Sequence, residues 1–439
     1  MSELPAGWSE TEIGSINTYR SETLDPAKSP KQTFELYSVP IFPKRKPEVV
    51  EGRDIGSTKQ KVEPDDVLLC KINPRINRVW VVGKKNDHEQ IASSEWIVIR
   101  QPLFDPAFIR LQLQEPSFRE RLCAEVSGVG GSLTRAQPKK VEGYKLRIAP
   151  LAEQKRIAQK LDALLAQVDT LKARIDAIPT LLKRFRRSVL TAALSGELTE
   201  QWRNDHPQED WVSVKIGSIC KLKSGVAISA DHEKSAGDAP YFKVGEMNRP
   251  GNELFLQHTD RYLMTADAPS RAIMPRGSIL FPKRGGAIAT NKKRVLKEPS
   301  FVDLNIMGII VPDGVEVMYV YRWLETIDLG KLNTGSTIPQ VNNSDIAPLL
   351  IPIPSREEQT EIVRRVEQLF AYADQLEAKV AAAQQRIDAL TQSLLAKAFR
   401  GELVPQDPTD EPASVLLERI RTQRAAAPKP KRGRKAATS

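Results

Sequence analysis

The chain has 439 residues, of which 40% are hydrophobic and 27% charged, and this composition excludes a wholly disordered or fibrous protein. At about 150 residues per domain, its length predicts about three structural units. No apolar run approaches the ~18 residues of a membrane span, and Met1–Pro5 lacks the features of a signal peptide. We therefore expect a cytoplasmic chain with no membrane partner.

Residues 1–149 show a mixed α/β pattern and are predicted to form a first domain. Strand-like runs at 67–70, 79–82 and 96–99 are bounded by Gly, Pro, Asn and Asp, and residues 106–121 are typical of a helix. Because no sequence pattern fixes the order of such strands in a sheet, the strand order is left open.

An internal repeat decides the architecture. Sliding the sequence by 205 residues places Glu153-Gln154 on Glu358-Gln359, and Gly196–Leu198 on Gly401–Leu403, with no gap between. The chain therefore reads as domain, helix, domain, helix and tail. The predicted segments are a first domain at 1–149, a central helix at 150–200, a second domain at 201–353, a C-terminal helix at 354–404, and a short helix with a disordered basic tail at 405–439.

The repeated segment is helical by its period, because apolar residues recur every three or four positions in both copies. Such a stripe needs a partner helix, and two matching stripes in one chain most simply pair with each other. The predicted seam consists of Ile157, Leu161, Leu164, Val168, Leu171, Ile175, Leu182, Phe185 and Val189 with Ile362, Val366, Leu369, Ala373, Leu376, Val380, Ile387, Leu390 and Leu394.

Punctuating residues bound these helices. Ser355 to Glu358 has the spacing of a capping box, Gly196 and Gly401 suit left-handed C-terminal caps, and Pro179 predicts a kink or a break. The 33 residues from Ile157 to Val189 would span about 50 Å.

The predicted fold class is α+β. Two mixed α/β domains are separated by two long helices that form an antiparallel coiled coil. A domain of about 150 residues lies between the helices and can return the chain, so antiparallel pairing is favoured, with a pseudo-twofold internal repeat.

The second domain repeats the mixed pattern of the first. Its strand-like runs fall at 278–281 and 307–311, and residues 317–329 are typical of a helix.

Each domain carries polar loops with side chains that match DNA. Arg, Lys and Asn have donors and acceptors suited to base edges in the major groove, and Lys also contacts phosphates. Any one such loop is as readily a solvated turn, but both domains have a pair of them. The predicted DNA-binding residues are Lys71, Asn73, Arg75, Asn77, Arg78, Ser132, Thr134 and Arg135 in the first domain, and Lys283, Arg284, Asn291, Lys292, Ser336 and Gln340 in the second.

Residues suited to catalysis are not found in the sequence. It has no phosphate-binding loop ending in Lys-Ser/Thr, no glycine fingerprint after a strand and no paired cysteines for a metal. We therefore predict no catalytic residue, no metal site and no enzyme activity. The net charge of +10 instead favours a nucleic-acid partner, although five basic residues of Pro428–Ser439 supply half of it.

Together these motifs resemble the specificity subunit of type I restriction-modification systems. Pro150–Gln154 and Gly196–Leu198 bound one helix, Glu358-Gln359 and Gly401–Leu403 bound the other, and two dissimilar domains precede them. Glu361–Asp374 and Lys397–Leu403 look most like the type IA subfamily.

The resemblance implies a non-catalytic subunit that directs adenine-N6 methylation or restriction in bacterial defence. Each target recognition domain would bind one half of a bipartite double-stranded DNA site, and the helices would set the spacer and dock two methyltransferase subunits. Two restriction subunits would join the complex, and S-adenosylmethionine, ATP and magnesium would sit on these partners. The alternative from the residues alone is a structural coiled-coil adaptor that joins two protein-binding domains.

Overall fold

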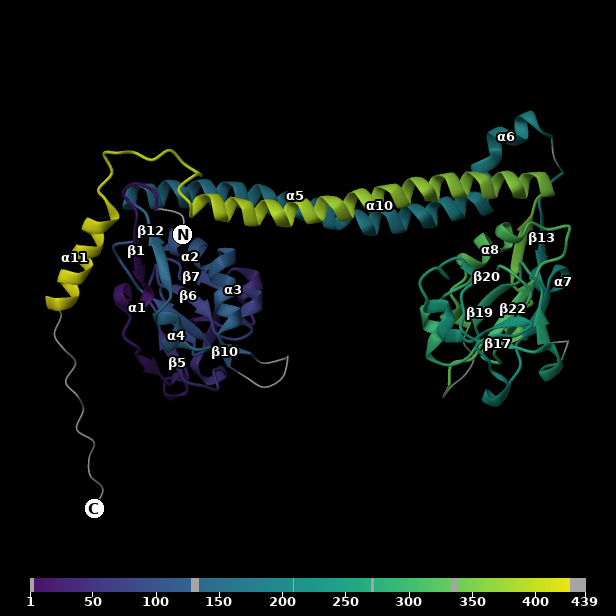
Figure 1. Cartoon of the computed structure of the whole chain (residues 1–439), viewed down its shortest axis with the longest axis horizontal. Helices are drawn as coiled ribbons and strands as arrows, with labels where there is room; N and C mark the ends of the chain where they lie inside the picture. The colour runs from purple at the N-terminus through teal and green to yellow at the C-terminus, as the bar shows by residue number, and fades with distance from the viewer. Residues whose placement is uncertain (1–3, 128–133, 208, 270–271, 333–337, 427–439) are drawn as a thin grey trace, which may run out of the picture. The chain divides into compact units, whose positions relative to one another are not determined.

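A computed structural model describes residues 4–127, 134–207, 209–269, 272–332 and 338–426 (Figure 1). The chain divides into two compact units. The first holds Met1–Asp176 and Ala382–Ser439, and the second holds Ala177–Ala381. Each unit combines one globular domain with a segment of each long helix. Among the described residues, no helix is both long and apolar enough to cross a membrane.

The first domain is built on small sheets. One sheet has the strand order β2-β5-β8-β3-β4 and another the order β7-β6-β9, while β1 pairs with β12 and β10 with β11. The strands predicted at 67–70, 79–82 and 96–99 are confirmed as β6, β7 and β9. The bounds are Ser9–Glu12 (β1), Thr23–Leu24 (β2), Thr33–Tyr37 (β3), Glu48–Glu51 (β4), Lys59–Lys61 (β5), Val67–Cys70 (β6), Val79–Val81 (β7), Glu89–Ser93 (β8), Trp96–Ile99 (β9), Val126–Ser127 (β10), Arg135–Ala136 (β11) and Lys145–Ile148 (β12).

The second domain follows a similar plan. Its sheets have the orders β14-β22-β19-β20-β16 and β17-β15-β21-β18, and β13 pairs antiparallel with β23 as β1 does with β12. The strands predicted at 278–281 and 307–311 are confirmed as β19 and β22. The bounds are Val212–Lys215 (β13), Lys221–Ser224 (β14), Ala239–Phe242 (β15), Phe255–Leu256 (β16), Tyr262–Leu263 (β17), Ile273–Met274 (β18), Ile279–Pro282 (β19), Arg294–Leu296 (β20), Ser300–Val302 (β21), Ile306–Ile310 (β22) and Leu350–Ile353 (β23).

The helices differ from the predicted ones at two places. The single helix expected at 106–121 is two helices, because Pro116 cannot continue the first and begins the second. The helix expected at 317–329 ends at Glu325. The bounds are Ile13–Ile16 (α1), Pro106–Leu113 (α2), Pro116–Ala124 (α3), Pro138–Glu142 (α4), Leu151–Leu194 (α5), Glu200–Asp205 (α6), Ile216–Ile219 (α7), Val317–Glu325 (α8), Asn343–Ile346 (α9), Arg356–Ala398 (α10) and Ala413–Ala426 (α11).

The long helices α5 and α10 run antiparallel in each unit. In the first unit, Lys172 Nζ lies 2.8 Å from Asp388 Oδ1, and Gln384 Nε2 donates to Asp176 Oδ1 at 2.8 Å. In the second unit, Arg186 Nη2 lies 2.7 Å from Asp374 Oδ1. In these three pairs, each step forward along α5 is matched by an equal step back along α10. The same antiparallel register therefore holds in both units.

Most residues of the predicted seam are buried or half-buried, but two of them are exposed. Ile157, Leu161, Val168, Leu182, Val189, Ile362, Val366, Ala373, Val380 and Ile387 are buried, and Leu164, Ile175, Phe185, Leu369, Leu376 and Leu394 are half-buried. Leu171 and Leu390 are instead 48% and 46% exposed. Both lie near the Lys172–Asp388 ion pair, where a pair of helices covers only one side of each apolar stripe.

The signals at the helix ends are only partly confirmed. Gly196 (φ 80°) and Gly401 (φ 73°) adopt the predicted left-handed conformation. The break expected at Pro179 does not occur, since α5 is one helix from Leu151 to Leu194 and proline removes only one of its backbone hydrogen bonds. Ser355 Oγ accepts from Glu358 N at 3.3 Å as a cap, but the Glu358 carboxylate does not complete the box, because other donors occupy it.

The repeated Glu-Gln motif fastens the start of each long helix to its domain. Trp8 Nε1 donates to Glu153 at 3.1 Å, and Trp211 Nε1 donates to Glu358 at 2.9 Å. The next residue of the motif binds a helix of the domain in both copies: Gln154 Oε1 accepts from Asp105 N at the start of α2, and Gln359 Oε1 accepts from Glu316 N at the start of α8.

The two buried carboxylates of this motif differ in their partners. Glu358 also accepts from Thr199 Oγ1 and from Arg203 Nη1, each at 2.6 Å. The repeat places Val404 and Pro408 at the positions of Thr199 and Arg203, and Glu153 Oε1 has no hydrogen-bond partner within the described residues. Burial accordingly raises the pKa of Glu153 above its ordinary 4.5.

The substitution Glu358→Gln is expected to cost about 2–3 kcal/mol in the free energy of unfolding, because it removes the charge that pairs with Arg203. The matched Glu153→Gln should be nearly neutral at pH 7. Wild-type stability should also fall as pH rises above 4.5, since the folded state holds the Glu153 proton more tightly than the unfolded state does. Urea unfolding of the wild type and the two variants, measured from pH 4.5 to pH 7, checks both effects. Equal losses in the two variants would contradict the difference in partners.

The main core of each unit lies between its domain and its helix segments. In the first unit, Phe108 of α2 contacts Phe399, just beyond the end of α10, with ring centroids 5.3 Å apart. In the second unit, Tyr319 of α8 and Val366 of α10 are fully buried in the same cluster. At about 1.5–3 kcal/mol for each large apolar side chain, such burial fixes each domain to its part of the helix pair.

Helix α11 belongs to the first unit and lies beside α1 (Figure 1). Ala413 N donates to Gly7 O at 2.8 Å, and Arg424 Nη1 donates to Gly14 O at 2.7 Å. Leu416 of this helix is buried in the core of the unit. The short helix expected within 405–439 thus corresponds to α11, and the tail at 427–439 lies outside the described residues.

Candidate nucleic-acid interface

The structure brings the two polar loops of the first domain together. Asn73 N donates to Thr134 O, and Ala136 N donates to Lys71 O, both at 2.9 Å. Residues 71–78 and 134–136 therefore form one surface, named here the first loop pair. It unites the predicted residues Lys71, Asn73, Arg75, Asn77 and Arg78 with Thr134 and Arg135, while Ser132 lies outside the described residues.

The first loop pair has a distinctive backbone conformation. A 3-10 turn, η4 (Pro74–Ile76), is bounded by Asn73 (φ 47°) and Asn77 (φ 49°), both left-handed. Asn tolerates this conformation better than other residues with a side chain, and Pro presets the first position of the turn. Arg119 of α3 fastens the turn further by donating to Arg75 O at 2.5 Å.

The second domain builds its loops in the same way. Gly285 N donates to Pro339 O, and Val341 N donates to Lys283 O, both at 2.8 Å. Residues 283–291 and 338–341 form the second loop pair. Its turn η10 (Gly286–Thr290) lies between two residues of positive φ, Gly285 (φ 77°) and the left-handed Asn291 (φ 52°), much as η4 lies between Asn73 and Asn77.

The predicted side chains of the first loop pair differ in their partners. Arg75 is exposed, whereas Arg78 Nη1 donates to Ile72 O at 3.4 Å. Arg135 Nη2 lies 3.0 Å from Glu95 Oε1. Asn77 Oδ1 is buried with no hydrogen-bond partner in the described part of the chain. Arg75 and Arg135 are both exposed, but Arg135 is already paired with Glu95, so Arg75 is the stronger candidate of the two for contact with a ligand.

The second loop pair shows a comparable mixture. Arg284 is exposed, and Lys283 Nζ donates to Ser224 Oγ at 2.8 Å. Lys292 Nζ hydrogen-bonds Asn248, and Gln340 Nε2 donates to Asn342 Oδ1 at 2.6 Å. Asn291 is a structural anchor as well as a predicted contact. Ser336 lies outside the described residues.

A buried lysine holds the end of the second loop pair. Lys293 Nζ donates to Asn291 Oδ1 at 2.8 Å and to Ile327 O at 2.7 Å. Desolvation of this ammonium group lowers its pKa to about 8. Lys293 therefore stabilises the loop from the protein interior, through these two hydrogen bonds.

Sequence reasoning missed Glu95 beside the first loop pair and Asn305 beside the second. Lys71 N donates to Glu95 O at 2.9 Å, and Lys283 N donates to Asn305 O at 2.8 Å. Glu95 also holds Arg135, and its Oε2 is buried without a hydrogen-bond partner in the described residues. Both residues precede a predicted strand, but only the strand pairing reveals that they reach the loops.

A cleft of about 600 Å³ borders the first loop pair. Its walls include Asn77 and Trp80 of the domain and Asp169 and Thr391 of the helix segments in the same unit. Arg45 also lines it, and desolvation lowers the pKa of this guanidinium. The cleft lies between the loop pair and the helix segments of the first unit.

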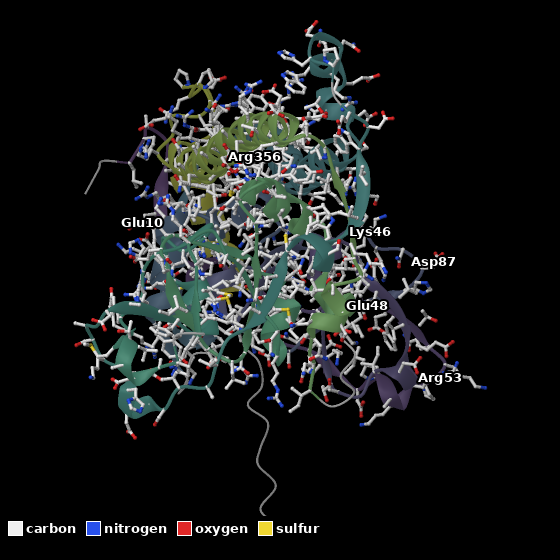
Figure 2. The ribbon with its side chains drawn as sticks, turned by 90° about the vertical axis from the view of Figure 1, so that its right-hand side faces the viewer. Glu10, Lys46, Glu48, Arg53, Asp87 and Arg356 are labelled. Atoms are coloured by element: carbon white, nitrogen blue, oxygen red, sulfur yellow. The ribbon has the colours of Figure 1, made fainter. Side chains whose placement is uncertain are left out.

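Acidic and basic side chains are mixed on one side of the first domain, where Figure 2 labels Lys46, Glu48, Arg53 and Asp87. The described residues also contain no group of three or more His, Cys, Asp or Glu side chains that could hold a metal ion. The distinguishing feature of each site is the geometry of its loop pair.

The substitution Gly285→Ala is expected to destabilise the second loop pair by about 1–3 kcal/mol. Gly285 (φ 77°, ψ −170°) occupies a region of backbone conformation that is open essentially to Gly alone. A Cβ atom would meet nothing within 4 Å at Gly285 or at Gly286, so the backbone conformation alone separates the two positions. Gly286→Ala is the matched control and should change stability little. Thermal unfolding measures both, and equal shifts would contradict a strained turn.

Two domains of one plan, each packed on an antiparallel helix pair and each presenting joined polar loops, define a duplicated binding protein. A family model described as type I restriction modification DNA specificity domain matches residues 208–383. The chain is 31% identical over 410 residues to the type I restriction enzyme EcoKI specificity subunit of Escherichia coli K12, covering 87% of this chain and 86% of that protein. It is 29% identical to the StySPI specificity subunit of Salmonella potsdam, covering 99% of each. The chain belongs to the family of type I restriction enzyme specificity subunits.

Solved structures show the same fold. One, titled as the structural basis of complex assembly and conformational transition of the type I R-M system, matches with a TM-score of 0.70 at 19% identity, covering 92% of this chain and all of that one. The HsdS subunit from Thermoanaerobacter tengcongensis matches with a TM-score of 0.60 at 19% identity, covering 91% and 98%. The mixed α/β domains and paired long helices are thus confirmed as the fold.

Proposed function

We propose that this chain is the sequence-specific DNA-binding subunit of a type I restriction-modification complex. Each domain would bind one half of a bipartite double-stranded DNA site. The observation that carries the proposal is the repeated loop pair, which both domains build from the same backbone hydrogen bonds but with different side chains. Two domains with the same loop geometry but different side chains suit two different half-sites.

The exposed arginines are the strongest candidates for base contacts. An arginine side chain can donate two hydrogen bonds to O6 and N7 of guanine in the major groove. Arg75 stands on the turn η4, and Arg284 directly precedes Gly285, whose φ is 77°. Lys71 and Lys283, at the base of each loop pair, suit contacts that position the protein on the DNA backbone. The other predicted DNA-binding residues stay predictions.

The helix pair is proposed to set the distance between the half-sites and to dock two methyltransferase subunits. Its exposed apolar residues Leu171 and Leu390 support a docking role, because a partner could cover them. Two restriction subunits would complete the complex in the cytoplasm. Catalysis, and the S-adenosylmethionine, ATP and magnesium that it needs, would belong to these partners, with this chain non-catalytic.

Footprinting of the purified chain with its methyltransferase partner tests the proposal. We expect protection of two short sequences at a fixed separation. Arg75→Ala should weaken protection of one and Arg284→Ala that of the other, each by about tenfold or more. Glu10→Ala, at an exposed position on β1, serves as the control. Protection that ignores sequence would contradict the proposal, and absence of any protection would instead favour the adaptor that joins two protein-binding domains.

A further inference from the structure

Ile76 is exposed at the tip of the first loop pair. It closes the turn η4, and 51% of its surface is accessible. Three features hold the turn in place. Its end residues are left-handed asparagines, Ile76 N donates to Asn73 O at 3.0 Å, and η4 packs against α3. A large apolar side chain is thus presented to solvent by a backbone that is fixed.

The fold does not require this exposure. The matching turn of the second domain, η10, also contains an isoleucine, and that residue, Ile288, is only 1% exposed. Within η4 itself, the other apolar residue, Pro74, is buried. Because burial of an aliphatic side chain is favourable, a ligand that covered Ile76 would gain free energy from this contact.

We propose that Ile76 contacts the 5-methyl group of a thymine in the half-site bound by the first domain; this assignment rests on the proposed function. The thymine methyl is the apolar group that a base pair presents in the major groove, and aliphatic side chains recognise it by direct contact. The preceding residue in the chain, Arg75, is exposed, and its side-chain type matches the guanine edge. One turn therefore presents a polar and an apolar side chain together.

A combined protein and DNA substitution tests this assignment. The chain is purified with its methyltransferase partner, and each thymine of the mapped half-site is replaced singly by deoxyuridine, which removes only the methyl group. At one position we expect wild-type affinity to fall about fourfold, the loss that corresponds to one buried methyl-sized group. Ile76→Ala should lower affinity for the thymine duplex by at least as much and should be insensitive to deoxyuridine at that position.

Two variants serve as controls. Val49→Ala removes a similarly exposed residue of the same domain, 59% accessible on β4, and should leave affinity and deoxyuridine sensitivity unchanged. Ile76→Val should retain most of the sensitivity to deoxyuridine.

The assignment would be overturned by a half-site without thymine, by a wild type indifferent to every deoxyuridine, or by full deoxyuridine sensitivity in Ile76→Ala. A loss of affinity in Ile76→Ala without any methyl dependence would also overturn it, and would indicate a wedge between bases. Failure of the wild-type complex to select any DNA sequence would instead refute the proposed function.

Discussion

Exchanging the interior of the first domain, residues 17–143, for the corresponding segment of a relative is expected to change one half of the methylated site and leave the other intact. Affinity for the original site should fall about 10³-fold or more, because each mismatched base pair typically costs 1–3 kcal/mol. These boundaries keep β1 and α1, whose neighbourhood holds the contacts of Trp8 with Glu153 and of Gly14 with Arg424. The chimaera should therefore fold and still bind its partners. Sequencing of methylated adenines reads the result.

The reciprocal exchange of residues 221–348 is the matched control. It keeps β13, α7 and β23 and should change only the other half-site. If either chimaera altered both halves, the assignment of one domain to one half-site would be wrong. A chimaera that kept the original site would show that the loop pairs do not determine specificity.

Lengthening the helix pair by four residues in both helices is expected to lengthen the spacer between the half-sites. Four residues add about 6 Å and slightly more than one helical turn, so the seam keeps its face. At about 3.4 Å per base pair, the spacer should grow by about one or two base pairs. The hydrogen bond between Asp176 and Gln384 identifies matched levels, so the insertions belong after Ala177 and after Ala382.

An insertion in α5 alone is the control for this prediction. It would displace one stripe past the other and break pairs such as Lys172 with Asp388 or Arg186 with Asp374. We expect loss of stability and of methylation in that variant. An unchanged spacer in the matched double insertion would refute the helix pair as the element that sets the distance.

Most of the helix pair could be predicted from the sequence because its signal is local and repeated. Spacings of three and four residues are set by helix geometry, and the second copy shows that they are not chance. Exposure of Leu171 and Leu390 could not be predicted, since it depends on how much of each stripe one partner covers. Of the kink or break predicted at Pro179, the break is wrong, because α5 continues through this residue and proline removes only one backbone hydrogen bond.

The loop pairs were predictable in composition but not in geometry. The polar residues around Asn73 and Gly285 indicate binding loops, yet their joining depends on hydrogen bonds to Thr134 and Pro339, more than 50 residues away in each case. Glu95 was missed for the same reason, because it reaches the site through strand pairing. Local patterns thus indicate candidate binding segments, and long-range pairing determines how those segments are joined.

Mapping of N6-methylated adenines in cells that express this chain with its methyltransferase partner tests the central claim most directly. Two specific half-sites separated by a spacer of fixed length and free sequence are expected, with methylation lost when the chain is omitted. Methylation that does not depend on the chain, or a single continuous recognition sequence, would contradict two domains that each read half of a divided site.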